Sequence, residues 1–120
     1  MEREHGPLVI VGDYNIAHRV IDMHDPKGNK DSSGFRPVER TWMDKFFAAG
    51  FVDTFRLAHG DTKDNYSWWS YRMNARDRNK GWRIDYISVS ESLAKKVKSA
   101  AIHPKVMGSD HCPIEIVLKV

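Results

Sequence analysis

The sequence has few of the features that mark secreted, disulfide-linked or membrane-spanning proteins. Its 120 residues include one cysteine, Cys112, which excludes an internal disulfide and is typical of a reducing compartment. The longest aliphatic run, residues 8–11, is far shorter than the roughly 18 residues of a membrane-spanning helix. The charged first residues, 1–5, predict no signal peptide. We therefore expect an intracellular protein without a membrane partner, located in the nucleus of a eukaryote and otherwise in the cytoplasm.

Lysine and arginine are distributed unevenly along the chain. Residues 1–60 carry 8 Lys/Arg and 9 Asp/Glu, whereas residues 61–120 carry 11 and 7. Most of the excess lies in residues 72–83, which hold five basic residues and one acidic residue. The aromatic residues within and beside this segment are Trp68, Trp69, Tyr71 and Trp82. A charged loop is most often simply solvated, but basic residues interleaved with aromatics suit contact with phosphates and bases. The segment therefore favours a nucleic-acid-binding surface.

Hydrophobic periodicity predicts an α/β domain in which short strands mix with two or three helices. The expected strands are residues 7–11, 65–71, 82–89, 97–102 and 113–120. A helix is expected from Val38 to the helix-ending Gly50, a short turn or helix at 51–57, and a short helix after the capping residue Ser90. The stripe of Trp42, Phe46 and Ala49 predicts the core-facing side of the first helix. Residues 22–37 form a long polar loop, which is usually functional or disordered.

Acidic and amide side chains lie at the ends of the predicted strands. Asp13 and Asn15 follow the first strand, and residues i and i+2 of an extended chain point to the same side. A carboxylate and a carboxamide can therefore face one spot. The two residue types also make turns for purely structural reasons, and the two interpretations are evenly balanced.

Asp85 lies inside a predicted strand, where a carboxylate needs a partner. One alternative is a structural salt bridge to Arg83 or Arg76. The other is a carboxylate that holds His111 in one tautomer. His111 follows Asp110 directly, just before the last predicted strand.

These residue types can serve phosphodiester hydrolysis. Carboxylate oxygens suit Mg²⁺, for which Mn²⁺ can substitute, and Mg²⁺ usually takes only one or two protein carboxylates. An oriented imidazole stabilises charge on the phosphate, and Asp13 beside Asn15 can orient or deprotonate a water. A thiol–histidine pair of Cys112 and His111 is disfavoured, because adjacent strand residues face opposite ways.

Three segments resemble the exonuclease III-type apurinic/apyrimidinic (AP) endonucleases of the endonuclease/exonuclease/phosphatase superfamily. They are Gly-Asp-Tyr-Asn at 12–15, Trp-Arg-Ile-Asp-Tyr at 82–86 and Ser-Asp-His-Cys-Pro at 109–113. Three further segments look like the branch that contains the major human AP endonuclease: Asp-Pro-Lys-Gly-Asn-Lys at 25–30, Gly34-Phe35 with Glu39-Arg40, and Met-Asn-Ala-Arg at 73–76. The resemblance extends from about Pro7 to the end of the chain.

The resemblance implies a DNA-repair enzyme that uses Mg²⁺ to hydrolyse the phosphodiester 5′ to an abasic site in double-stranded DNA, with 3′–5′ exonuclease and 3′-phosphodiesterase activity beside it. The residues it implies for catalysis are Asp13, Asn15, Asp85 and His111. Those it implies at the metal are Asp110, His111, Asp13 and Asn15. Those it implies for substrate binding are Trp68, Trp82 and Ile84 in the pocket for the baseless sugar, Arg72, Asn74 and Arg76 in the DNA-contacting loop, and Asn29 and Lys30 near the DNA backbone. Arg72 stands where the better-known enzyme has the methionine that enters the duplex.

The resemblance covers only the C-terminal half of a DNase I-like four-layer sandwich. We therefore expect residues 1–120 to be half of that domain, one mainly antiparallel sheet with flanking helices, without the N-terminal half. That half would supply an Asn, a Tyr and the Glu that is the principal metal ligand, and neither Glu2 nor Glu4 matches this Glu. Because residues 8–11 are apolar on both faces of their strand, we expect one sheet face to be bare. The missing half or a second chain would cover it.

Two other interpretations stay open. In the first, the chain is a non-catalytic DNA- or protein-binding remnant that uses residues 72–83. In the second, it is a phosphodiesterase of the superfamily that acts on lipids or inositol phosphates. The pocket aromatics and the loop at 73–76 argue against the latter.

Overall fold

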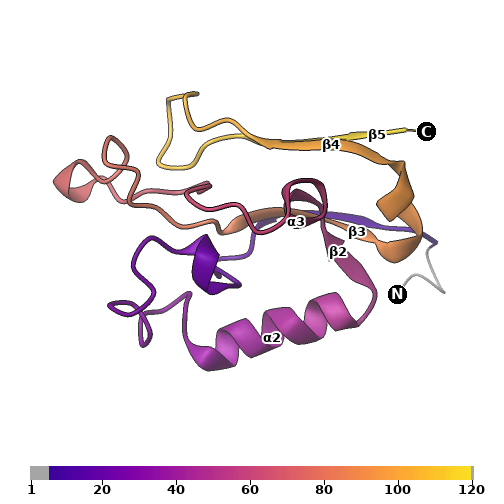
Figure 1. Ribbon diagram of the computed structural model, residues 1–120, viewed down its shortest axis with the longest axis horizontal. Coiled ribbons are helices and arrows are strands. Elements are labelled where there is room, and N and C mark those ends of the chain that lie inside the picture. The colour runs from indigo at the N-terminus through magenta and orange to yellow at the C-terminus, as the bar shows by residue number, and fades with distance from the viewer. Residues whose placement is uncertain (1–5, 120) are drawn as a thin grey trace.

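Two antiparallel sheets with flanking helices make up the computed structural model, which describes residues 6–119 (Figure 1). The α/β fold expected from the sequence is therefore present. The strands are β1 (Val9–Asp13), β2 (Phe51–Asp53), β3 (Asp85–Ser90), β4 (Val97–Ile102) and β5 (Ile114–Leu118). The α-helices are α2 (Pro37–Ala48) and α3 (Thr54–His59), and the 3₁₀ turns are η1 (Val20–Asp22), η2 (Arg72–Asn74) and η3 (Glu91–Lys96). No helix among the described residues is long and apolar enough to cross a membrane.

The first sheet has the strand order β1-β3-β2, so β3 lies in its centre. Val9 pairs with Val89 at one end of the β1–β3 ladder, and Asp13 pairs with Asp85 at the other. Directly paired residues of an antiparallel ladder point to the same face. This register therefore sets the two carboxylates side by side.

The second sheet pairs β4 with β5. Helix α3 contacts both β3 and β4, and β5 contacts β3, which joins the two sheets. The loops at residues 22–36, 60–84 and 103–113 gather at the end of the molecule far from both termini (Figure 1).

The face of β1 that carries Val9 and Val11 is exposed. These side chains are 43% and 62% accessible, whereas Val89 and Ile87, their partners on β3, are buried. The sheet face expected to be bare is thus covered at β3, and of these paired residues only those on the edge strand β1 are exposed.

Helix α2 is less deeply packed than its sequence pattern suggests. Met43 is buried, whereas Trp42 is 53% accessible and Ala49 is exposed, so the predicted core-facing stripe is wrong at both its ends. The Trp42 ring stacks on Phe46 at a centroid distance of 5.6 Å, and Phe46 stacks on Phe51 at 4.7 Å. This aromatic ladder buries one face of Trp42 without placing it in the core.

Of the predicted strands, only 97–102 has the extent that was expected. The first is shifted to 9–13 and the last covers 114–118, while the turn or helix expected at 51–57 is β2 followed by α3. Residues 65–71 make only isolated bridges, in which Trp68 pairs with both Trp82 and His111, and the strand expected at 82–89 begins only at Asp85. The cause lies in Ser67, whose hydroxyl accepts hydrogen bonds from the backbone N–H groups of residues 84 and 85, at 3.1 and 3.0 Å. A side chain here replaces the regular ladder. Glu2, Glu4 and Val120 lie outside the described residues.

A buried ion-pair network fixes the start of β3. Arg83 is 1% accessible and donates to Asp22 at 2.7 Å and to Asp53 at 3.0 Å. Asp22 also accepts from Arg56. Burial raises the pKa of Asp22, but the charges of Arg83 and Arg56 outweigh burial and lower it overall. Asp22 was expected in a polar loop; it is instead fully buried and ties η1 to β3.

Candidate active site

The His111 imidazole lies between two carboxylates. Its Nδ1 is 2.8 Å from Oδ2 of Asp85, and its Nε2 is 3.7 Å from Oδ2 of Asp13. One ligand atom of each of these three residues lies within 4.8 Å of the others. Since Asp13 ends β1, Asp85 begins β3 and His111 bridges to Trp68, three separate segments build this cluster.

The charges of the cluster favour a protonated imidazole. Burial lowers the pKa of His111, but its hydrogen bond to Asp85 and the charges of Asp85, Asp13 and Asp110 raise it above the ordinary 6.5. Burial raises the pKa of Asp85, and the hydrogen bonds from His111 and Ser67 oppose this rise. With Nδ1–H donated to Asp85, Nε2 is the imidazole atom on the Asp13 side.

The alternative partners of Asp85 are occupied elsewhere. Arg83 binds Asp22 and Asp53. Arg76 donates to backbone carbonyl groups. The structure therefore agrees with the carboxylate–histidine interpretation of Asp85 and not with the salt-bridge one.

Asn15 and Asp13 form a turn and face the site together. The Asn15 backbone N–H donates to Oδ1 of Asp13 at 2.8 Å. Asn15 has a φ of 57°, a left-handed conformation that Asn tolerates better than most residues. The Tyr14 N–H between them donates to the Ile84 carbonyl at 2.9 Å. Asp13 and Asn15 thus form a turn and also line the candidate site, so the two interpretations of this pair do not exclude each other.

Asp110 lies beside this cluster and is held by tryptophans. Its Oδ2 accepts from Nε1–H of Trp68 at 3.1 Å, and its carbonyl accepts from the backbone N–H of Trp69 at 3.1 Å. The Trp68 hydrogen bond is the main reason why the pKa of Asp110 is lowered. The His111 N–H donates to the Ser109 hydroxyl at 3.1 Å.

A cavity of about 490 Å³ joins the polar cluster to an apolar wall. Its polar lining comes from Asp13, Asn15 and His111, and its apolar lining from Trp68, Trp82 and Ile84. The two indole rings meet edge to face, with centroids 5.9 Å apart. Predicted catalytic and pocket residues thus line one cavity.

Ser32 and Ser33 also line this cavity, and the sequence interpretation missed them. The signal available was their place immediately before Gly34, whose φ is 95°. A Cβ on Gly34 would lie 2.9 Å from the Trp82 ring. The loop of residues 22–36 therefore approaches Trp82 closely because residue 34 is glycine.

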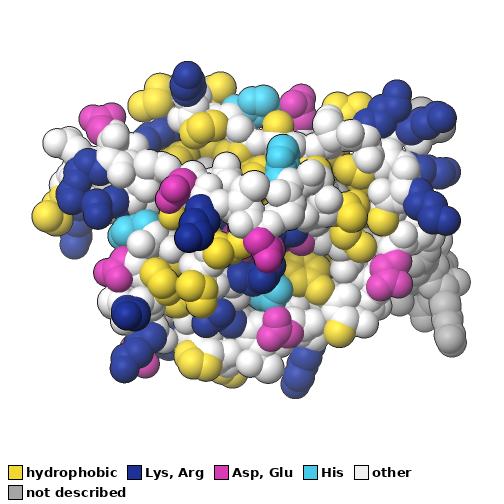
Figure 2. Space-filling model, viewed as in Figure 1, with side chains coloured by type: hydrophobic (Ala, Val, Ile, Leu, Met, Phe, Trp, Pro, Cys, Tyr) yellow, Lys and Arg dark blue, Asp and Glu magenta, His cyan; other side chains and the backbone are white. Residues whose placement is uncertain are grey.

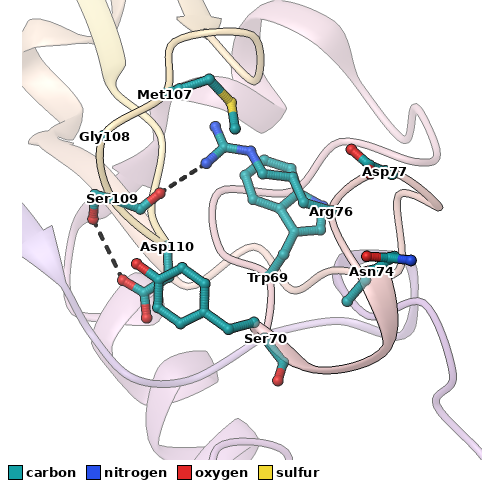
Figure 3. A pocket seen from close by; sticks show the side chains of 11 residues that line it. Trp69, Ser70, Asn74, Arg76, Asp77, Met107, Gly108, Ser109 and Asp110 are labelled. Atoms are coloured by element: carbon teal, nitrogen blue, oxygen red, sulfur yellow. Dashed lines mark hydrogen bonds between the residues drawn. The ribbon is translucent and has the colours of Figure 1, made fainter.

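Other residues expected to bind substrate lie outside this cavity. Arg72 and Lys30 are exposed. Asn29 donates to the Asp25 carbonyl at 2.8 Å. Asn74, Arg76 and Asp110 line a second cavity of about 350 Å³ (Figure 3). Among the described residues, the structure therefore leaves Asp110, which was expected at the metal, outside the lining of the first cavity and outside the cluster of Asp13, Asp85 and His111.

Cys112 takes no part in the site. It is buried, and its thiol donates to the Tyr66 carbonyl at 3.7 Å. Burial raises its pKa to about 11, which disfavours a thiolate.

Positive charge is not confined to the loops. Lys and Arg side chains gather at both ends of the face shown in Figure 2, the loop end and the opposite end. On this face, positive side chains therefore also lie away from the loop end (Figure 2).

Comparison with known proteins yields consistent matches. The model of the endonuclease/exonuclease/phosphatase family matches residues 1–111. An exodeoxyribonuclease of Bacillus subtilis is 51% identical over 114 residues, which cover 95% of this chain and 45% of that protein. The DNA repair nuclease APEX1 of Danio rerio is 46% identical over 114 residues, which cover 95% of this chain and 37% of that protein.

Solved structures match equally well. The AP endonuclease of Leishmania major superposes with a TM-score of 0.87 at 39% identity, covering 93% of this chain and 35% of that one. The 3′ phosphatase NExo from Neisseria, bound to product DNA hairpin, superposes with a TM-score of 0.91 at 30% identity, covering 98% and 47%. The chain thus spans less than half the length of each of these proteins.

Proposed function

The chain belongs to the endonuclease/exonuclease/phosphatase family and to its exonuclease III and AP endonuclease type, and from this premise we propose that it forms the phosphate-handling half of a DNA-repair nuclease. The substrate is double-stranded DNA with an abasic site. The reaction is Mg²⁺-dependent hydrolysis of the phosphodiester 5′ to that site, which leaves a 3′-hydroxyl, with 3′–5′ exonuclease and 3′-phosphodiesterase activity on the same centre. The observation that carries the proposal is the His111 imidazole between Asp85 and Asp13 in a cavity with an apolar wall.

His111 acts on the phosphate. Asp85 holds its Nδ1 and favours the charged ring, which leaves Nε2 on the Asp13 side. An imidazolium there donates to a phosphate oxygen and stabilises the charge that develops as the P–O bond breaks. Asp13, whose turn with Asn15 fixes its orientation, takes a proton from the attacking water or acts at the leaving oxygen.

The residues present fit a divalent cation with oxygen ligands. The carboxylate candidates are Asp13, in the cluster with His111, and Asp110, which lines the neighbouring cavity, and Asn15 adds an amide oxygen. Nε2 of His111 would be a ligand only in the neutral ring, because a protonated Nε2 has no free electron pair. Bound Mg²⁺ would neutralise phosphate charge and acidify a water. Two carboxylates suit a Mg²⁺ ion that keeps several waters. A further ligand would come from the N-terminal half.

The apolar wall accounts for the preference for abasic DNA. Trp68, Trp82 and Ile84 suit a deoxyribose without a base, flipped out of the duplex. At about 490 Å³ the cavity of this chain is wide enough for a small ligand, so steric rejection of a nucleotide that keeps its base would need the N-terminal half to narrow it. Flipping is least costly at a damaged position. Lys30, Asn29 and Arg72 would contact the DNA on either side.

The function also needs a partner for β1. The exposed Val9 and Val11 form an apolar strip at the edge of the sheet, and relatives are more than twice as long as the matched region. We therefore place the N-terminal half of the longer protein, or a second chain, against this strip.

A complementation experiment tests the proposal. The chain is incubated with a duplex that carries one abasic site, with and without Mg²⁺, alone and with the N-terminal half of the Bacillus subtilis relative. We expect binding without cutting by the chain alone, and Mg²⁺-dependent cutting once the second half is added. Binding that never leads to cutting would instead indicate the non-catalytic remnant.

A further inference from the structure

Two loops meet beside the active site at one guanidinium group, that of Arg76 (Figure 3). Nη1 donates to the Ser109 carbonyl at 2.8 Å, and Nη2 donates to the carbonyls of Pro104 and Val106, both at 2.8 Å. The guanidinium also lies over the Trp69 ring, 4.6 Å from its centroid. Arg76 thus links the loop after η2 to the loop between β4 and β5.

The segment that Arg76 holds leads directly into the active site. Ser109 precedes Asp110, and its hydroxyl donates to Oδ1 of Asp110 at 3.4 Å and accepts from the His111 N–H at 3.1 Å. The backbone N–H of Trp69, the residue under the guanidinium, donates to the Asp110 carbonyl at 3.1 Å. Arg76 therefore contacts both segments that fix the position of Asp110, the one with Ser109 and the one with Trp69.

The loop that presents Arg76 has an unusual backbone. Met73, Asn74 and Asn79 have φ values of 56°, 52° and 50°. Asn tolerates this left-handed conformation, so Met73 is the residue that its surroundings must hold in place. The loop is tied to Trp69 by the Arg76 guanidinium and, on the C-terminal side of Arg76, by Asn79, whose Oδ1 accepts from Nε1–H of Trp69 at 3.1 Å.

We propose that Arg76 is a positioning residue of the active site, which holds the segment of residues 104–109 so that Asp110 and His111 stay in register with Trp68 and Asp85. It does so in place of binding DNA, the role that the resemblance implies for it. The inference rests on the proposed function only for what Asp110 and His111 then do to the substrate.

Arginine suits this role better than lysine. Its planar fork presents several N–H donors in fixed directions and stacks on an aromatic ring, whereas lysine offers a single nitrogen on a flexible stem. The three carbonyl partners of Arg76 use the fixed donors, and the Trp69 ring uses the stacking.

The test uses the indole N–H of Trp68, which donates to Asp110, as a reporter of the position of Asp110. Arg76→Met keeps an apolar stem over Trp69 and removes every donor. We expect hydrogen exchange of the Trp68 indole, followed by NMR in this chain, to become about tenfold faster, the scale of one lost hydrogen bond to a charged group. Arg76→Lys should give an intermediate rate.

Two controls separate positioning from general loss of structure. The backbone amide protons of the β1–β3 ladder, which the fold protects, should exchange at their original rates in every variant. Arg78→Ala removes a neighbouring arginine whose side chain donates to the Met73 carbonyl at 3.3 Å, within its own loop, and it should leave the Trp68 rate unchanged.

An unchanged Trp68 rate in a folded Arg76→Met variant would overturn the proposal. If Arg76→Met does not fold, Arg76→Lys decides, and a wild-type exchange rate of the Trp68 indole in that variant would overturn the proposal equally.

In the complementation assay, Arg76→Met should lower kcat about tenfold and leave KM for DNA unchanged, whereas a rise in KM alone would assign Arg76 to DNA binding. Absence of cutting by the wild-type pair counts against the proposed function, and the Trp68 result still decides the role of Arg76.

Discussion

Asp13 and Asp85 are direct partners in the β1–β3 ladder, and one imidazole, that of His111, contacts both carboxylates. The two acids are 72 positions apart in the chain. Their roles differ because of burial and partners: Asp85 is the more buried and holds Nδ1, and Asp13 is the more exposed and faces Nε2 and the cavity. A matched pair of carboxylates with different surroundings is a common way to divide acid–base roles in an active site.

The first prediction concerns Asp85→Asn. Removing the charge beside Nδ1 should lower the pKa of His111, because Asp85 contributes the largest effects that raise it. The measurement is a pH titration of the imidazole nitrogens by NMR. An unchanged His111 pKa would show that Asp85 does not hold the ring.

The same linkage predicts how stability depends on pH. The folded-state pKa of His111 lies above 6.5, so its contribution to stability is full below that pH and is lost as the pH rises through the folded pKa. The free energy of unfolding, measured in denaturant at several pH values, should therefore decrease above pH 6.5. In His111→Asn this part of the decrease should disappear.

The second prediction concerns the buried ion-pair network. Arg83→Met leaves Asp53 buried without its cation and Asp22 with Arg56 alone, which should lower the free energy of unfolding by about 3–5 kcal/mol. Arg19→Ala is the matched control, because the Arg19–Asp61 pair is solvent-exposed and should matter by about 0–1 kcal/mol. Equal effects of the two variants in a denaturant titration would contradict the role given to the network.

The third prediction concerns Gly34. Gly34→Ala combines a positive φ with a Cβ 2.9 Å from the Trp82 ring, so it should destabilise the protein and disturb the apolar wall. Gly60→Ala also has a positive φ, 65°, but meets no atom within 4 Å, and should cost only the backbone strain of about 1–3 kcal/mol. Thermal unfolding with tryptophan fluorescence distinguishes them. Equal losses would show that the contact with Trp82 is unimportant.

The fourth prediction concerns the face of β1. Val11 is 62% accessible, so Val11→Glu should change the stability of this chain by no more than about 0.5 kcal/mol. It should nevertheless prevent association with the N-terminal half, measured by sedimentation, because a charge would be buried at that contact. Val38→Glu, at a valine on α2 that is 73% accessible, should leave association intact. Association of Val11→Glu at wild-type strength would place the partner elsewhere.

Local motifs were more predictable from the sequence than their partners. Asp13 with Asn15, and Asp110 with His111, are neighbours in the chain, so their chemistry could be recognised directly. The partner of Asp85 could not be chosen among Arg83, Arg76 and His111, because strand register and loop paths decide it.

Packing against distant residues explains one further difference. Asp22 was expected in a polar loop, but two arginines far along the chain pair with it and bury it. Trp42 was expected in the core and is instead half exposed, with Phe46 of the same helix stacked on its ring. A distant partner therefore outweighs the local pattern at Asp22, whereas at Trp42 the helical period alone did not show which side faces the core.

The most direct test of the central claim is incision of abasic DNA by the reconstituted pair with Asp13→Asn in this chain. The wild-type pair should cut 5′ to the abasic site in the presence of Mg²⁺, and the Asp13→Asn pair should bind the same DNA with nearly unchanged affinity and not cut it. Cutting by Asp13→Asn at the wild-type rate, or an equal loss of binding and cutting, would contradict the catalytic role given to Asp13.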